Sequence, residues 1–157
     1  MGLLGDLQAL FGKKNQPEIP PGTPDNVVAP NLGVPQKKVL IVEDEKLLAN
    51  ALESKFKHEN FQVFKAENGQ LGLDMAVANK PDVILLDLMM PVMDGKTMLH
   101  KLREMEQFKF LPVVVLTNAG EVDNMRETKT FDNASAFLIK SNVNPDDIVQ
   151  VVHDSIR

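Results

Sequence analysis

Apolar residues follow two different sequence patterns from about residue 37 onward. Short unbroken runs such as Val39–Val42 and Val83–Leu86 predict strands that are buried on both faces, as in a parallel sheet. Between these runs, apolar residues recur at the spacing of an amphipathic helix. The predicted strands are 39–42, 61–64, 83–86, 112–116 and 136–139. The predicted helices are about 45–58, 68–79, 95–105, 122–131 and 145–156.

The regular alternation of strands and helices predicts the fold class. Strands joined through helices form right-handed crossovers, which give a parallel sheet covered by helices on both faces. We therefore expect an α/β domain over residues 37–157. Within its first helix, the spacing predicts an inner face made of Leu47, Leu48, Ala51, Leu52 and Phe56.

Polar residues of specific kinds follow four of the predicted strands. They are Glu43 and Asp44 after the first strand, Asp87 after the third, Thr117 after the fourth and Lys140 after the fifth. The C-terminal ends of parallel strands lie on one edge of a sheet, so these side chains should gather in one crevice. If the strand order is 2-1-3-4-5, Asp44 and Asp87 become neighbours.

This set of side chains indicates a site that binds both a metal ion and an anion. Three carboxylates at close quarters repel one another, and a divalent cation removes that conflict. An all-oxygen ligand set without Cys or His suits Mg²⁺. The hydroxyl of Thr117 and the ammonium of Lys140 favour an anion, and a phosphoryl group carried on a carboxylate meets both demands.

Composition narrows the function classes. The 157 residues include no cysteine, which excludes disulfides, thiolate chemistry and a Cys zinc site. The net charge of −5 and the lack of a basic patch argue against nucleic-acid binding. No apolar run approaches the ~18 residues of a membrane span, and a signal peptide is not evident. We expect a cytoplasmic location.

The N-terminal 36 residues differ in character from the rest. Residues 15–36 carry six of the ten prolines and predict an extended, flexible linker. Residues 1–14 are a candidate for a short amphipathic helix. In the isolated protein we expect a frayed, mostly disordered terminus; the alternative is a docking helix, for which we prefer a protein partner to a membrane. Its apolar stripe consists of Leu3, Leu4, Leu7, Leu10 and Phe11.

From about residue 37 to the C terminus, the sequence resembles the receiver domains of bacterial two-component response regulators. The matching motifs are VLIVEDE at 39–45, LLDLMMPVMDG at 85–95, LTNA at 116–119 and FLIK at 137–140. The resemblance implies a flavodoxin-like doubly wound fold with strand order 2-1-3-4-5 and Mg²⁺ as cofactor. It also implies that Asp87 accepts a phosphoryl group from the phosphohistidine of a sensor histidine kinase or a histidine phosphotransfer protein.

The resemblance also implies roles for the other site residues. The residues that match the Mg²⁺ ligands are Glu43, Asp44, Asp87 and the backbone carbonyl of Met89. Thr117 matches the switch hydroxyl, Lys140 the lysine of the site and Phe137 the aromatic rotamer switch. The fourth helix, fifth strand and fifth helix then form the surface that responds to phosphorylation and signals to a target. The chain departs from the family at Ser141, where proline is usual.

Two other functions remain open at this stage. A receiver-like module that binds partners without being phosphorylated would keep the same fold. An Asp-based phosphatase would pair its nucleophile with a second Asp two residues later, where this chain has Met89. In the preferred interpretation the chain is a stand-alone phosphoacceptor that catalyses only its own phosphorylation and dephosphorylation, since no DNA-binding domain follows residue 157.

Removal of residues 1–35 tests the predicted domain boundary. The truncated chain should accept phosphoryl from acetyl phosphate at the rate of the full chain, because the linker contributes nothing to the predicted core. Co-purification of partners or cellular localisation should weaken, because a tethered helix raises effective concentration. Unfolding of the truncated chain, measured by circular dichroism, would show that the boundary is wrong.

Overall fold

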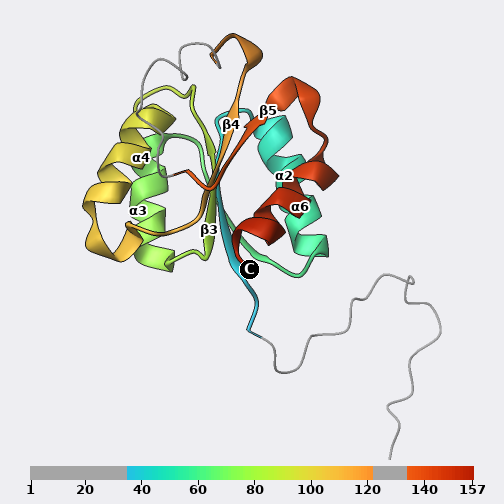
Figure 1. The fold of residues 1–157 in the computed structure, drawn as a ribbon, viewed down its shortest axis with the longest axis horizontal. Coiled ribbons are helices and arrows are strands. Elements are labelled where there is room, and N and C mark those ends of the chain that lie inside the picture. Colours follow the sequence, from blue (N-terminus) through green and yellow to red (C-terminus); the bar gives the residue numbers. More distant parts are fainter. Residues whose placement is uncertain (1–34, 122–133) are drawn as a thin grey trace, which may run out of the picture. The chain divides into compact units, whose positions relative to one another are not determined.

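Five parallel strands form one sheet in the order β2-β1-β3-β4-β5 (Figure 1). The computed structural model of the chain describes residues 35–121 and 134–157. The strands are β1 (Lys38–Val42), β2 (Gln62–Ala66), β3 (Val83–Asp87), β4 (Val113–Thr117) and β5 (Ala136–Ile139). The predicted α/β class and strand order are therefore confirmed, and the second strand lies at a sheet edge as its alternating sequence indicates.

Helices cover both faces of this sheet (Figure 1). The helices are α2 (Lys46–His58), α3 (Gly69–Asn79), α4 (Gly95–Glu104) and α6 (Pro145–Ser155). The described residues also form the short 3₁₀ helices η1 (Glu106–Phe108), η2 (Ala119–Glu121) and η4 (Lys140–Asn142). In the view of Figure 1, α3 and α4 lie on one side of the sheet, and α2 and α6 lie on the other.

Some predicted elements lie outside the described residues. These are the helix at 122–131, the tail helix at 1–14 and nearly all of the linker at 15–36. Among the helices that are described, none combines the length and the apolar character that a membrane crossing requires.

The sheet separates two apolar layers. Successive residues of β1 point to opposite faces, so Leu40 and Val42 join the layer under α3 and α4, while Val39 and Ile41 join the layer under α2 and α6. All residues of β3 and β4 are buried, including their terminal Asp87 and Thr117. Burial on both faces explains why these strands are unbroken apolar runs.

The prediction for the inner face of the first helix is partly wrong. Leu47 is 81% exposed and Ala51 is also exposed, whereas Ala49, Leu52 and Phe56 are buried. The helix carries two overlapping apolar stripes in its sequence, and spacing alone does not choose between them. Packing against the sheet buries the stripe of Ala49, Leu52 and Phe56 and leaves Leu47 and Ala51 in solvent.

The start of α4 approaches the end of β3 very closely. The Gly95 N–H donates to the Leu88 carbonyl at 3.0 Å, and the Asp94 side chain caps the helix by accepting from the Thr97 N–H at 2.7 Å. A Cβ on residue 95 would lie 2.1 Å from the Asp87 carbonyl oxygen. A glycine at this position is therefore needed for the helix to lie against the backbone that carries Asp87.

Gly95→Ala should destabilise the protein by about 3 kcal/mol, because the added methyl clashes with backbone atoms that cannot rotate away. The matched control is Gly120→Ala in η2, where an added Cβ meets nothing within 4 Å and the change should stay within about 0.5 kcal/mol. Urea denaturation of both variants measures the difference. Equal stability of the two variants would contradict the close packing of α4 on β3.

Candidate functional site

The polar residues at the strand ends lie together at the C-terminal edge of the sheet. Glu43 follows β1 directly, Asp87 and Thr117 end β3 and β4, and Lys140 follows β5. Because β1 and β3 are neighbours with Val42 opposite Leu86, the next residues on both strands lie side by side. The strand order thus brings together residues that are up to 97 positions apart in the chain.

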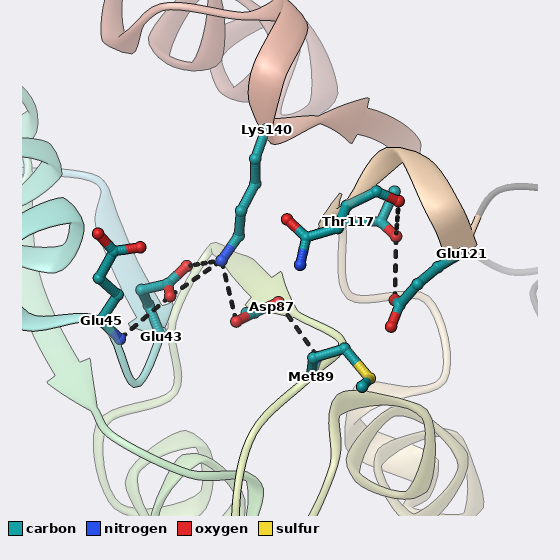
Figure 2. Close-up of polar contacts among 8 residues, drawn as sticks. Glu43, Glu45, Asp87, Met89, Thr117, Glu121 and Lys140 are labelled. Carbon is teal, nitrogen blue, oxygen red and sulfur yellow. Dashed lines mark hydrogen bonds and ion pairs between the residues drawn. The ribbon is translucent and has the colours of Figure 1, made fainter.

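Lys140 joins the two buried carboxylates. Its Nζ lies 3.0 Å from Glu43 Oε1, 2.8 Å from Glu43 Oε2 and 3.0 Å from Asp87 Oδ2. Glu43 is 3% exposed and Asp87 is 2% exposed. Figure 2 shows the ammonium pointing to both carboxylates, with Thr117 and Glu121 on the right of the view. Ser141, where the family usually has proline, leaves these ion pairs intact.

Backbone amides hold the same two carboxylates from the other side. The Glu45 N–H donates to Glu43 Oε1 at 3.2 Å, and the Met89 N–H donates to Asp87 Oδ1 at 3.1 Å. Within residues 35–121 and 134–157, Glu43 Oε2 accepts no hydrogen bond, and its 2.8 Å contact with Lys140 is an ion pair without hydrogen-bond geometry. This buried oxygen retains the capacity to bind a further positive group.

The acidic residues form a possible cation site. Glu43, Asp44 and Asp87 each offer a carboxylate oxygen, and these atoms lie within 4.8 Å of one another. Asp44 is exposed, so the site opens to solvent through this residue. Hard oxygen ligands, excess negative charge and the under-coordinated Glu43 Oε2 fit Mg²⁺. Met89 is exposed, and its backbone lies beside Asp87. The position of Met90 in the same loop predicts that it also lines the site, but Met90 is buried in the apolar layer.

Burial dominates the electrostatics of Glu43. It raises the pKa of this carboxyl to about 7, the hydrogen bond from Lys140 opposes the rise, and the charge of Asp87 adds to it. Burial lowers the pKa of Lys140, but its hydrogen bonds and ion pairs with Glu43 and Asp87 outweigh this effect and leave the pKa above its ordinary value. The two carboxylates therefore favour the charged form of Lys140.

The Thr117 hydroxyl points away from Asp87 and toward Glu121 (Figure 2). Thr117 is 1% exposed, and its Oγ1 donates to Glu121 Oε2 at 3.2 Å and to the Asn118 carbonyl at 3.3 Å. The sequence reasoning missed Glu121, although a carboxylate four residues after the strand-end hydroxyl was a signal that could have found it. Phe137 on β5 is 43% exposed, so its ring lies at the surface.

Comparison with known proteins places the chain in a family. A family model described as the response regulator receiver domain matches residues 39–153. Sporulation initiation phosphotransferase F of Bacillus subtilis is 34% identical over 101 residues, which cover 64% of this chain and 80% of that protein. Transcriptional regulatory protein SrrA of Staphylococcus aureus is 35% identical over 120 residues, which cover 76% of this chain and 48% of SrrA. The chain thus spans about half the length of SrrA.

Solved structures share the same fold. A putative response regulator from Chloroflexus aurantiacus superposes with a TM-score of 0.70 at 27% identity, over 78% of this chain and 98% of that one. The receiver domain of sensor histidine kinase PA1611 from Pseudomonas aeruginosa superposes with a TM-score of 0.69 at 21% identity, over 78% of this chain and 98% of that one. The latter structure has a magnesium ion coordinated in its active-site cleft.

The raised pKa of Glu43 should make stability depend on pH. Between pH 4.5, the ordinary value, and about pH 7, the folded state retains a proton that the unfolded state has released. The free energy of unfolding should therefore fall as pH rises through this window, by roughly 3 kcal/mol in total. Urea denaturation without divalent cations at pH 4.5, 5.5 and 7 measures it.

Glu43→Gln should remove this component of the pH dependence, because glutamine carries no titrating proton. Glu106→Gln, at an exposed position on η1, is the matched control and should retain the wild-type decline. A decline in Glu43→Gln parallel to that of wild type would contradict the retention of the proton on Glu43.

Proposed function

This chain belongs to the response regulator receiver domain family, and on that premise we propose that it is the phosphoacceptor of a two-component phosphorelay. Asp87 takes the phosphoryl group from a phosphohistidine of a sensor histidine kinase or histidine phosphotransfer protein. The observation that carries the proposal is the buried Asp87 carboxylate, held by Lys140 and the Met89 amide beside Glu43 and Asp44.

The transfer step is a displacement at phosphorus. One carboxylate oxygen of Asp87 attacks, so an O–P bond forms and the P–N bond of phosphohistidine breaks. The electron pair stays on the ring nitrogen, which leaves as neutral imidazole when the other ring nitrogen carries a proton. Lys140, 3.0 Å from Asp87 Oδ2, neutralises charge on the acceptor and then on the transferred oxygens.

The donor set for Mg²⁺ would be Glu43, Asp44, Asp87 and the backbone carbonyl of Met89. Bound Mg²⁺ would balance the charge of the phosphoryl oxygens and of the carboxylates that surround them. The exposed Asp44 lies at the entrance, while the buried Glu43 offers the oxygen that accepts no hydrogen bond. Magnesium in the cleft of the PA1611 receiver domain supports this assignment.

Phosphorylation would act as a switch. It adds about −1.5 to −2 charges at Asp87, which attracts the Thr117 hydroxyl and the Lys140 ammonium. Movement of Thr117 vacates space toward which Phe137 can turn from its exposed position. The surface formed by β5, α6 and the predicted helix at 122–131 then changes and signals to a target protein. We also propose that the tail stripe around Leu7 can dock on a protein partner. The location that fits this function is the cytoplasm.

Incubation with acetyl phosphate and Mg²⁺, followed by intact mass measurement, tests the function. Wild type should gain one phosphoryl mass, and Asp87→Asn should gain none because the amide is a poor nucleophile. Asp44→Asn should need a higher Mg²⁺ concentration for the same uptake, since it removes one of few anionic ligands. Asp74→Asn, on the exposed surface of α3, is the matched control and should behave as wild type.

Three outcomes would count against the proposal. Uptake by Asp87→Asn at the wild-type rate would move the acceptor to another residue. No uptake by wild type from acetyl phosphate or from a phosphorylated kinase domain would favour the binding module that is never phosphorylated. Repeated release of inorganic phosphate without a phosphoryl-protein, measured over many turnovers, would favour the phosphatase.

A further inference from the structure

The hydrogen bond between Thr117 and Glu121 links the site to a residue that the phosphoryl chemistry does not use. Thr117 ends β4, and Glu121 ends the short helix η2 that follows it (Figure 2). The hydroxyl is buried, whereas Glu121 is partly exposed. A buried hydroxyl requires a partner, and this carboxylate is one of the acceptors within reach of the Thr117 proton.

Two acceptors share this proton, and they are unequal. A threonine hydroxyl has one proton to donate. The Glu121 Oε2 lies at 3.2 Å and the Asn118 carbonyl at 3.3 Å. A hydrogen bond to an ionised carboxylate is stronger than one to a neutral carbonyl, so Glu121 is the dominant acceptor. The same proton cannot at the same time be given to a phosphoryl oxygen on Asp87.

We propose that Glu121 is a positioning residue for the switch: its carboxylate holds the Thr117 hydroxyl away from Asp87 until a phosphoryl group competes for the same proton. The proposal rests on the proposed function, because it assumes that Thr117 binds the phosphoryl group. The Glu121 carboxylate accepts the Thr117 proton only in the unswitched state. It therefore lowers the population of the switched conformation in the unphosphorylated protein.

The proposal predicts which state each variant favours. Removal of the carboxylate destabilises the unswitched state alone, so Glu121→Ala should bind a phosphoryl analogue more tightly than wild type. A net hydrogen bond of ordinary strength corresponds to a change of roughly 3- to 10-fold in the apparent dissociation constant. Glu106→Ala is the matched control, because it removes a carboxylate from another short 3₁₀ helix, η1, and should leave the constant unchanged.

A double-mutant cycle separates this role from simple charge repulsion. Glu121 is negative, so its removal would also favour an anion on Asp87 through long-range electrostatics. In a Thr117→Ala background no hydroxyl proton remains to be held. The tightening caused by Glu121→Ala should therefore disappear in that background if Glu121 acts through Thr117, and persist if it acts through its charge.

Beryllofluoride, a tetrahedral analogue of the phosphoryl group, is the probe, and it is titrated in the presence of Mg²⁺ into the full chain. Tightening by Glu121→Ala in wild type but not in Thr117→Ala supports the proposal. Equal tightening in both backgrounds, or none in wild type, overturns it. Glu121→Gln is the second variant if Glu121→Ala is poorly folded, and it should tighten binding less because its amide oxygen still accepts.

A measurement on the unmodified protein keeps this test separate from the proposed function. Side-chain scalar couplings of Thr117, measured by NMR, should show a rotamer change in Glu121→Ala and none in Glu106→Ala. An unchanged rotamer overturns the positioning role even if Asp87 is phosphorylated. Failure of beryllofluoride binding and phosphoryl uptake in every variant, together with a changed rotamer, would instead reject the proposed function; Glu121 would then orient the Thr117 hydroxyl, but its role in a phosphorylation switch would be overturned as well.

Discussion

One lysine between two buried carboxylates is the interaction on which the site depends. Glu43 and Asp87 are nearly inaccessible to solvent, and a buried carboxylate is costly unless it is paired. Lys140 contacts both, yet with the exposed Asp44 nearby the site holds three carboxylates and one ammonium. Burial raises the pKa of Glu43 and the charge of Asp87 adds to the rise, so a bound divalent cation would relieve the excess negative charge of the site.

The fold brings Lys140 and the two buried carboxylates together because all three lie at the C-terminal ends of its strands. Parallel strands place their C-terminal residues on one edge, and the order 2-1-3-4-5 makes β1 and β3 neighbours there. The backbone around Asp87 is then fixed by α4, whose first residue is a glycine because no side chain fits against the Asp87 carbonyl. The helix start, the strand end and the Asp87 carboxylate are therefore packed closely together, and the proposed phosphoryl transfer would depend on such positioning.

The strands and helices, and the residues at the strand ends, could largely be predicted from the sequence. Strands buried on both faces must be unbroken apolar runs, so β3 and β4 were found within one residue of their observed bounds. The inner face of α2 was misassigned at Leu47 and Ala51, because a helix with two overlapping apolar stripes can satisfy its spacing in two ways. The contact surface of the sheet, which no local pattern contains, decides between them.

The sequence by itself determined the class of the fold, the gathering of Glu43, Asp44, Asp87, Thr117 and Lys140 at one edge, and the oxygen-rich chemistry of that edge. These follow from strand periodicity and from residue type, which are local properties. Only the tertiary structure decided that Lys140 joins Glu43 as well as Asp87, that burial raises the pKa of Glu43 to about 7, and that Thr117 is turned toward Glu121. Distances, desolvation and competition for a single proton depend on how separate elements pack, and no linear pattern encodes them.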